Sequence, residues 1–163
     1  MKKLTFADFL SKFPPVVMPV TLGEDTHHTF GTENNPLSDE LIAQYIRPTE
    51  AFEPDEEFTE YVPCFAIDDT KQFIAVVWWK AELLNYEYVL ATFDGKGELI
   101  DRQVIAQTKV EGDKVYRAVA TISVDLELVI AEGLSGDAAD HFDPETMRTR
   151  YLEIQASGHI VEG

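Results

Sequence analysis

The stretch from residue 61 to residue 156 most constrains the fold, because it consists of short segments rich in β-branched and aromatic residues, separated by turn signals. Such segments are typical of the strands of an antiparallel meander. We expect strands at roughly 61–67, 72–82, 85–94, 98–107, 114–122, 125–132 and 149–156. Glycines at 95, 97 and 112 lie between three of these segments and permit the positive φ that hairpin turns often require.

The segment 73–79 has the sequence Phe-Ile-Ala-Val-Val-Trp-Trp, with no polar side chain on either face. Since alternate residues of a strand point to opposite faces of a sheet, both faces of this strand must be buried. We expect helices to cover one face and a curled sheet or a loop to cover the other. The segment 125–130 alternates polar and apolar residues at its start, which places it nearer the rim of the sheet.

The N-terminal part predicts two short helices. Apolar residues between 6 and 13 recur at spacings of three and four, Thr5 and Asp8 form a capping box, and Pro14 stops the helix. Ser38 is expected to cap the second helix, which Pro48 ends. Residues 15–36 are predicted to form a long loop with one short strand around 16–20, and residues 50–60 an exposed acidic linker.

These patterns together predict an α+β protein built mainly on an antiparallel β-meander. We expect about six or seven strands in a curved sheet or partly closed barrel, with the two helices packed on it. A chain of 163 residues can bury one sizeable core. We therefore expect a single domain over 1–163, with a helical and loop-rich acidic part at 1–60 and the sheet at 61–163.

The formal net charge of −17 disfavours nucleic acid and anionic membranes as partners. Thirteen acidic residues and one basic residue, Arg47, lie between Phe13 and Thr70, so this part carries −12. Our first hypothesis is a non-enzymatic interaction protein, of immunity or inhibitor type, whose acidic surface binds a basic protein. The acidic residues proposed for that surface are Glu53, Asp55, Glu56, Glu57, Asp137 and Asp140.

The alternative is a small-molecule-binding or hydrolase-like domain, with a pocket between the curved sheet and the 15–36 loop. Trp78, Trp79, His27 and His28 are the candidate residues, and Tyr86, Tyr88 and Phe93 on the next strand could join them. Core packing explains the same aromatic residues without a ligand. A third hypothesis is an accessory or structural domain whose acidity serves solubility alone.

Two groups of residues have the chemistry of metal ligands. His27 and His28 lie beside Glu24 and Asp25, but adjacent residues in an extended chain cannot easily reach one ion. Acidic residues at 137–145, with His141 among them, resemble a calcium loop in composition, but their spacing is not that of an EF-hand. We therefore expect no bound metal and no cofactor.

No catalytic signature names a reaction, because the nucleophile-elbow, P-loop and dinucleotide-binding motifs are all missing from the sequence. Cys64, the single cysteine, lies in an apolar segment that predicts a buried thiol. Asp8 and Lys12 interrupt the apolar run that a signal peptide requires, and no stretch approaches the roughly 18 apolar residues of a membrane span. We expect a cytoplasmic protein; the oligomeric state stays open.

Overall fold

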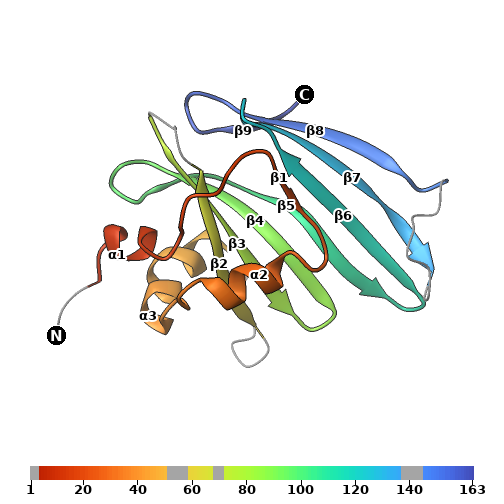
Figure 1. Ribbon diagram of the computed structural model, residues 1–163, viewed down its shortest axis with the longest axis horizontal. Coiled ribbons are helices and arrows are strands. Elements are labelled where there is room, and N and C mark those ends of the chain that lie inside the picture. The colour runs from red at the N-terminus through yellow and green to blue at the C-terminus, as the bar shows by residue number, and fades with distance from the viewer. Residues whose placement is uncertain (1–3, 51–58, 68–71, 137–144) are drawn as a thin grey trace.

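The computed structural model describes residues 4–50, 59–67, 72–136 and 145–163. Its strands form one antiparallel sheet of nine strands, ordered β2-β3-β4-β5-β6-β7-β8-β9, with β1 paired to β6 (Figure 1). The strands are β1 (Val20–Leu22), β2 (Glu60–Ile67), β3 (Ile74–Glu82), β4 (Asn85–Phe93), β5 (Leu99–Glu111), β6 (Lys114–Ile122), β7 (Glu127–Gly136), β8 (Arg148–Ile154) and β9 (Ile160–Glu162).

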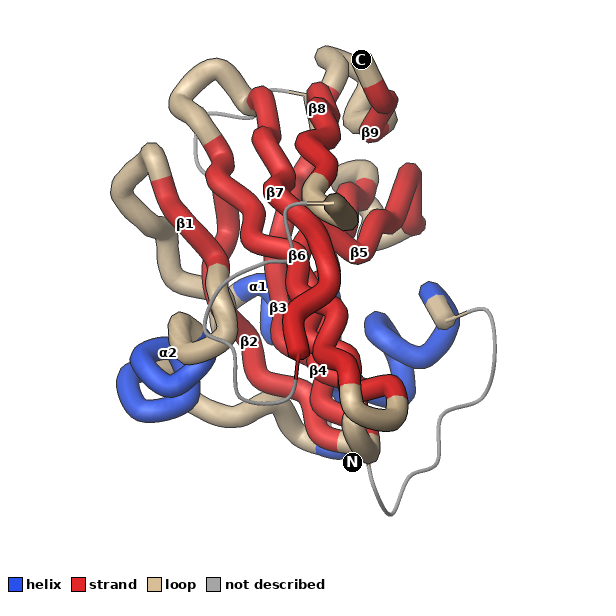
Figure 2. The backbone as a smooth tube through the Cα atoms, turned by 90° about the vertical axis from the view of Figure 1, so that its right-hand side faces the viewer, coloured by secondary structure: helices blue, strands red, loops and turns tan. Residues whose placement is uncertain are grey.

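The helices are short and precede the main sheet in the chain. They are α1 (Phe6–Leu10), α2 (His27–Glu33), α3 (Asp39–Leu41), a π-helical turn (Ile42–Ile46) and a 3₁₀ turn (Arg47–Thr49). Figure 2 shows the helical segments beside the middle and lower parts of the sheet, while β8 and β9 lie at the top. In the described part of the chain, none of the helices is long and apolar enough to cross a membrane.

The predicted α+β class and the antiparallel meander are confirmed, but the predicted number of strands is wrong. Nine strands are present in place of six or seven, and the sheet does not close into a barrel. Strands β1 and β9, three residues long each, lie outside the seven predicted strands of the meander. Strand β1 overlaps the short strand expected around 16–20 only at Val20. Segments this short show too little periodicity to be located accurately from a sequence.

The sheet divides at β5 into two halves. The first part of β5 pairs with β4 alone, and an irregularity between Tyr88 and Val89 marks where its register changes. Only Gln107–Glu111 of β5 pairs with β6, and β1 takes the place of β5 along the rest of β6. Strand bulges bend a sheet and increase its twist. As a result, side chains of β2–β4 and side chains of β6–β9 meet in one core.

Strand β3 is covered on both faces, as the sequence predicts. Trp79, with Ala75 and Val77, packs in the core between the two halves of the sheet. Trp78, with Val76, packs on the opposite face against residues of α1, α3 and the π-helical turn. The two adjacent tryptophans therefore belong to two different cores.

Both predicted N-terminal caps are confirmed, but the 15–36 segment is not a continuous loop. Thr5 and Asp8 form the capping box of α1, and the Ser38 hydroxyl accepts a hydrogen bond from the Leu41 amide at the start of α3. The strand expected there around 16–20 is found at Val20–Leu22 as β1, and the segment also contains helix α2, which was not predicted. Helix α2 has no buried residue and no side-chain cap, so its sequence lacks the apolar stripe that signals a helix.

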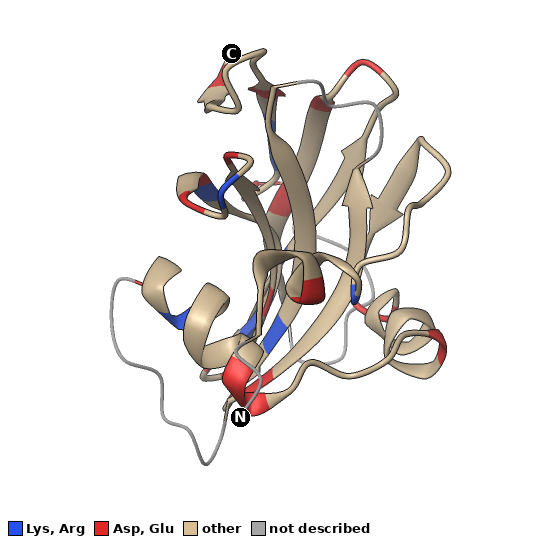
Figure 3. Ribbon diagram, turned by 90° about the vertical axis from the view of Figure 1, so that its left-hand side faces the viewer, with Lys and Arg blue, Asp and Glu red and all other residues tan. Residues whose placement is uncertain are grey.

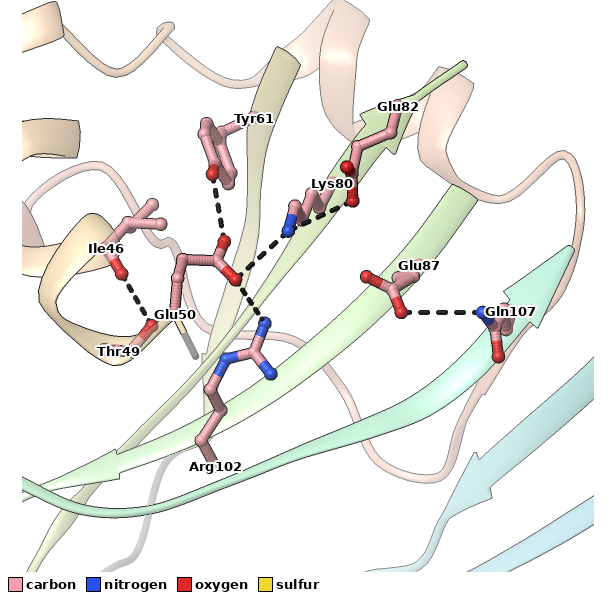
Figure 4. Close-up of polar contacts among 9 residues, drawn as sticks. All are labelled: Ile46, Thr49, Glu50, Tyr61, Lys80, Glu82, Glu87, Arg102 and Gln107. Carbon is pink, nitrogen blue, oxygen red and sulfur yellow. Dashed lines mark hydrogen bonds and ion pairs between the residues drawn. The ribbon is translucent and has the colours of Figure 1, made fainter. Parts of the chain in front are cut away.

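The exposed linker predicted for residues 50–60 is wrong at its first residue. The side chain of Glu50 is only 6% exposed and lies between the helical turns and the sheet (Figure 4). One carboxylate oxygen accepts a hydrogen bond of 2.9 Å from the Tyr61 hydroxyl. The other accepts bonds of 3.0 Å from Lys80 Nζ and 3.1 Å from Arg102 Nη2. Residues 51–58 lie outside the described residues.

We expect the Glu50→Gln substitution to lower the free energy of unfolding by about 2 to 3 kcal/mol, because it leaves the buried Lys80 and the partly buried Arg102 facing a neutral amide. Lys80 keeps a second partner, Glu82, at 3.1 Å, which limits the loss. The exposed Glu98→Gln change is the matched control. Urea unfolding followed by tryptophan fluorescence measures both; equal stability of the two variants would contradict an anchoring role for Glu50.

Candidate ligand pocket

A cavity of about 270 Å³ lies where the segment between β1 and α2 crosses the sheet. Strands β3, β4, β5 and β6 form its floor, and residues 23–27 form its wall. The lining residues are Gly23, Glu24, Asp25, His27, Trp79, Tyr86, Tyr88, Gln107, Thr108 and Ala118.

The register of β3 and β4 places the aromatic side chains on one face. Trp79 pairs directly with Tyr88, and Tyr86 lies two residues from Tyr88, so the three side chains share a face of the sheet. The Tyr88 hydroxyl donates a hydrogen bond of 2.9 Å to the carbonyl of Gly23. The amide of Gly23 in turn donates to the Thr26 hydroxyl at 2.9 Å. The first bond holds the 23–27 segment against the sheet, and the second stabilises the turn within that segment.

His27, Trp79 and Tyr86 form a set of nearly parallel rings. The His27 ring stacks on Trp79 with 3.9 Å between the centroids and 3° between the planes. Tyr86 lies parallel to Trp79 at a centroid distance of 5.9 Å. Trp79 is almost fully buried. Tyr86, in contrast, is 37% exposed and stands at the mouth of the cavity. Aromatic walls of this kind favour a ligand with a flat or cationic group.

His27 is held in its neutral form. Burial lowers the pKa of His27 first, and the neighbouring His28, whose ring centroid lies 4.1 Å away, lowers it further. A hydrogen bond with the Glu24 backbone acts in the opposite direction, as do the charges of Asp25 and Glu60, but together they do not reverse the shift. The Nδ1 atom of His27 is buried and has no hydrogen-bond partner among the described residues. A buried polar atom without a partner is costly, and a ligand can supply the missing bond.

Polar groups surround the aromatic set. Glu24 and Asp25 are exposed on the wall, and Glu24 forms an ion pair of 3.2 Å with Arg117. The side chain of Gln107 donates to Asn85 at 2.8 Å. It also lies 3.5 Å from a Glu87 carboxylate oxygen (Figure 4). Glu87 lies between Tyr86 and Tyr88 in β4, so its carboxylate belongs to the opposite face of the sheet and not to the cavity. The charged groups that line the aromatic set are therefore Glu24 and Asp25.

The structure brings together only part of the residue set proposed from the sequence. His27 and Trp79 line the cavity, with His28 adjacent to His27. Trp78 points to the helix-covered face and is fully buried, and Phe93 belongs to that same core. The proposed acidic residues lie outside the described residues; they are Glu53, Asp55, Glu56, Glu57, Asp137 and Asp140.

Sequence reasoning did not find Gly23, Gln107, Thr108 and Ala118, which also line the cavity. Three of them come from β5 and β6, and their position follows from the register at the point where the sheet divides. Gln107 faces Glu87 across one strand pair and Ala118 across the other. No local pattern in the sequence specifies this register, so only the structure places these residues.

Metal and thiol chemistry find little support in the described part of the chain. No group of three or more His, Cys, Asp or Glu side chains is arranged there to hold a metal ion. The candidate calcium loop falls largely outside the described residues, at 137–144. Cys64 is fully buried, and burial raises the pKa of its thiol, which disfavours the reactive thiolate.

A second hollow, of about 430 Å³, lies between the end of α1, helix α2 and β2. Its most prominent polar side chain, Asn34, donates two hydrogen bonds, of 2.7 Å to the carbonyl of Pro63 and 2.9 Å to that of Cys64. These bonds occupy carbonyl groups on the edge of β2, which is a structural task. The cavity at Trp79 is therefore the stronger candidate site.

Comparison with models of protein families, with curated proteins and with solved structures found no match for this chain.

We expect His27 to make the protein sensitive to acid. The pKa of His27 is lower in the folded protein than its ordinary value of 6.5, so the folded state takes up this proton less readily than the unfolded chain. Stability should therefore fall as the pH drops below 6.5 toward the folded-state pKa. The His27→Gln variant should lose less stability between about pH 7.5 and pH 5 than the unmodified protein. Urea unfolding at each pH measures this.

The exposed His159→Gln change is the matched control, because it removes a histidine far from the cavity in the turn before β9. An identical pH profile for the His27→Gln variant and the unmodified protein would show that His27 is not held neutral by its surroundings.

Proposed function

We propose that this protein binds a small organic ligand in the cavity between the sheet and residues 23–27, and that it does so without catalysing a reaction. The observation that carries the proposal is the buried Nδ1 atom of His27, which lacks a partner, in a cavity floored by Trp79, Tyr86 and Tyr88. Apolar pockets with a few convergent polar groups are the usual form of a ligand site. At about 270 Å³, the cavity suits a ligand smaller than most drug-sized molecules.

The side chains of the cavity support binding better than catalysis. General acid–base chemistry needs a side chain that is oriented by a partner and has a pKa near the working pH. The Tyr88 hydroxyl is committed to the Gly23 carbonyl, and burial raises its pKa. His27 is oriented by stacking on Trp79 rather than by a carboxylate. The arrangement offers a rigid surface for contact, with no paired nucleophile and base among the lining residues.

We expect a library of small soluble compounds to contain ligands that raise the thermal unfolding temperature, since binding to the folded state stabilises it. Tyr86→Ala should weaken such ligands about tenfold, because it removes an aromatic wall at the mouth of the cavity. Tyr151→Ala is the matched control, as Tyr151 is also an exposed strand tyrosine but lies on β8. Isothermal titration calorimetry compares the variants; hits that bind both with unchanged affinity would place the site elsewhere.

A basic protein partner is a second candidate function, and the distribution of charge favours it. Residues 13–70 carry −12 of the total charge of −17. In the described part of this segment, the exposed acidic residues are Glu24, Asp25, Glu33, Asp39, Glu40 and Glu60. Figure 3 shows acidic positions on the N-terminal segments with few basic ones between them. Complementary charge of this kind speeds association and weakens with salt.

The acidic-surface hypothesis predicts a partner that is retained from lysate at low salt and lost at high salt. Changing Glu53, Asp55, Glu56 and Glu57 to neutral amides should weaken that binding about tenfold or more. The control variant neutralises Glu98, Asp113 and Asp125, which are exposed in turns of the sheet. A partner whose affinity changes neither with salt concentration nor with the four substitutions would argue against an interface that depends on charge.

A further inference from the structure

We infer that the ligand of the cavity is a small organic cation. The juxtaposition that carries this inference is the pair of aromatic rings of Trp79 and Tyr86 beside the carboxylates of Glu24 and Asp25 and the Nδ1 atom of His27, which has no hydrogen-bond partner in the part of the chain that the structure describes. The inference rests on the proposed function, since it names the class of molecule that the same cavity takes.

Charge at the cavity favours a cation over an anion. Two of the ten lining residues are acidic, and none of the ten is Lys or Arg. Arg117 lies next to the cavity wall and is paired with Glu24, so these two charges offset each other and Asp25 is the lining carboxylate that attracts a cation. The side chain of Asp25 is 91% exposed, and its Oδ1 atom lies 3.8 Å from Nε2 of His28. Against a net charge of −17, a carboxylate or phosphate ligand would be repelled and a cation attracted.

The aromatic rings supply the second half of the recognition. A cation is attracted to the face of a tryptophan or tyrosine ring, and the attraction grows when both groups are shielded from water. Trp79 lines the cavity but is only 8% exposed and has the His27 ring stacked on it, so Tyr86, which is 37% exposed, is the more accessible of the two rings. Tyr86 stands at the mouth, parallel to Trp79, where an entering cation meets it first.

His27 is suited to accept a hydrogen bond from such a ligand. A neutral imidazole that carries its proton on Nε2 has a lone pair on Nδ1. Because its surroundings lower its pKa, the ring adds no positive charge that would repel the ligand. An amidinium, guanidinium or ammonium group can donate an N–H to Nδ1 while it lies against the aromatic rings. A neutral apolar ligand would leave Nδ1 without a partner.

Three probes of nearly equal size and different charge test the inference: benzamidine, which is cationic, benzamide, which is neutral, and benzoate, which is anionic. We expect calorimetry at pH 7.5 and low salt to show benzamidine binding at least about tenfold more tightly than benzamide. Benzoate should not bind measurably. Benzamide or benzoate binding as tightly as benzamidine would overturn the inference.

Variants show whether the two recognition elements act as described. Asp25→Asn should weaken benzamidine about three- to tenfold and leave benzamide unchanged, and Asp125→Asn, an exposed acid in the β6–β7 turn, should change neither. Tyr86→Leu should weaken benzamidine, whereas Tyr86→Phe, which keeps the ring, should not. Equal affinity for benzamidine in the Leu and Phe variants would show that the aromatic ring of Tyr86 does not contribute to binding.

The compound library separates this inference from the function on which it rests. If most of the hits that depend on Tyr86 are neutral or anionic, the cavity binds ligands but the inference that its ligand is a cation is wrong. If neither the probes nor any library compound bind in a manner that depends on Tyr86, the proposed function fails as well. Cationic compounds dominating those hits would support both.

Discussion

The structure depends on one strand, β3, that must be buried on both faces. Its residues Val76 and Trp78 need an apolar cover on one side, and Val77 and Trp79 need another on the opposite side. A single open antiparallel sheet would leave one of these faces in water. The chain meets the requirement with a helical layer on one face and with the second half of its own sheet on the other.

The candidate pocket lies on the face of β3 that the second half of the sheet covers, and it results from the way in which the two halves of the sheet are joined. Strand β5 pairs with β6 only from Gln107 onward, and β1 takes its place farther along β6, so the chain entering α2 passes over the first half of the sheet. Tyr88 pins this passing segment at Gly23, and His27 closes over Trp79. On the other face, Glu50 ties the helical layer to three strands through Tyr61, Lys80 and Arg102. Each cover is thus held by polar contacts as well as by apolar packing.

The sequence was informative where a short-range pattern determines the structure. The capping residues Thr5 and Ser38, the doubly buried β3 and the antiparallel class were all predicted from local spacing. Helix α2 was missed because it has no buried face, and the burial of Glu50 was missed because its partners lie 11 to 52 residues away in sequence. For the site, aromatic alternation pointed to Trp79 and Tyr88, but Trp78 was grouped with them although adjacent strand residues face opposite ways. Gln107 and Ala118 depended on a register that no local signal encodes.

The two neighbouring tryptophans provide the most direct measurement of the central claim, since their indole groups report on opposite faces of the same strand. In a two-dimensional NMR titration with benzamidine, the indole N–H resonance of Trp79 should shift progressively with ligand concentration. The resonance of Trp78, in the helix-covered core, should stay in place. Two results would contradict a ligand site on the Trp79 face. One is a shift of the Trp78 resonance without a shift of the Trp79 resonance, and the other is no shift of either resonance while calorimetry reports binding.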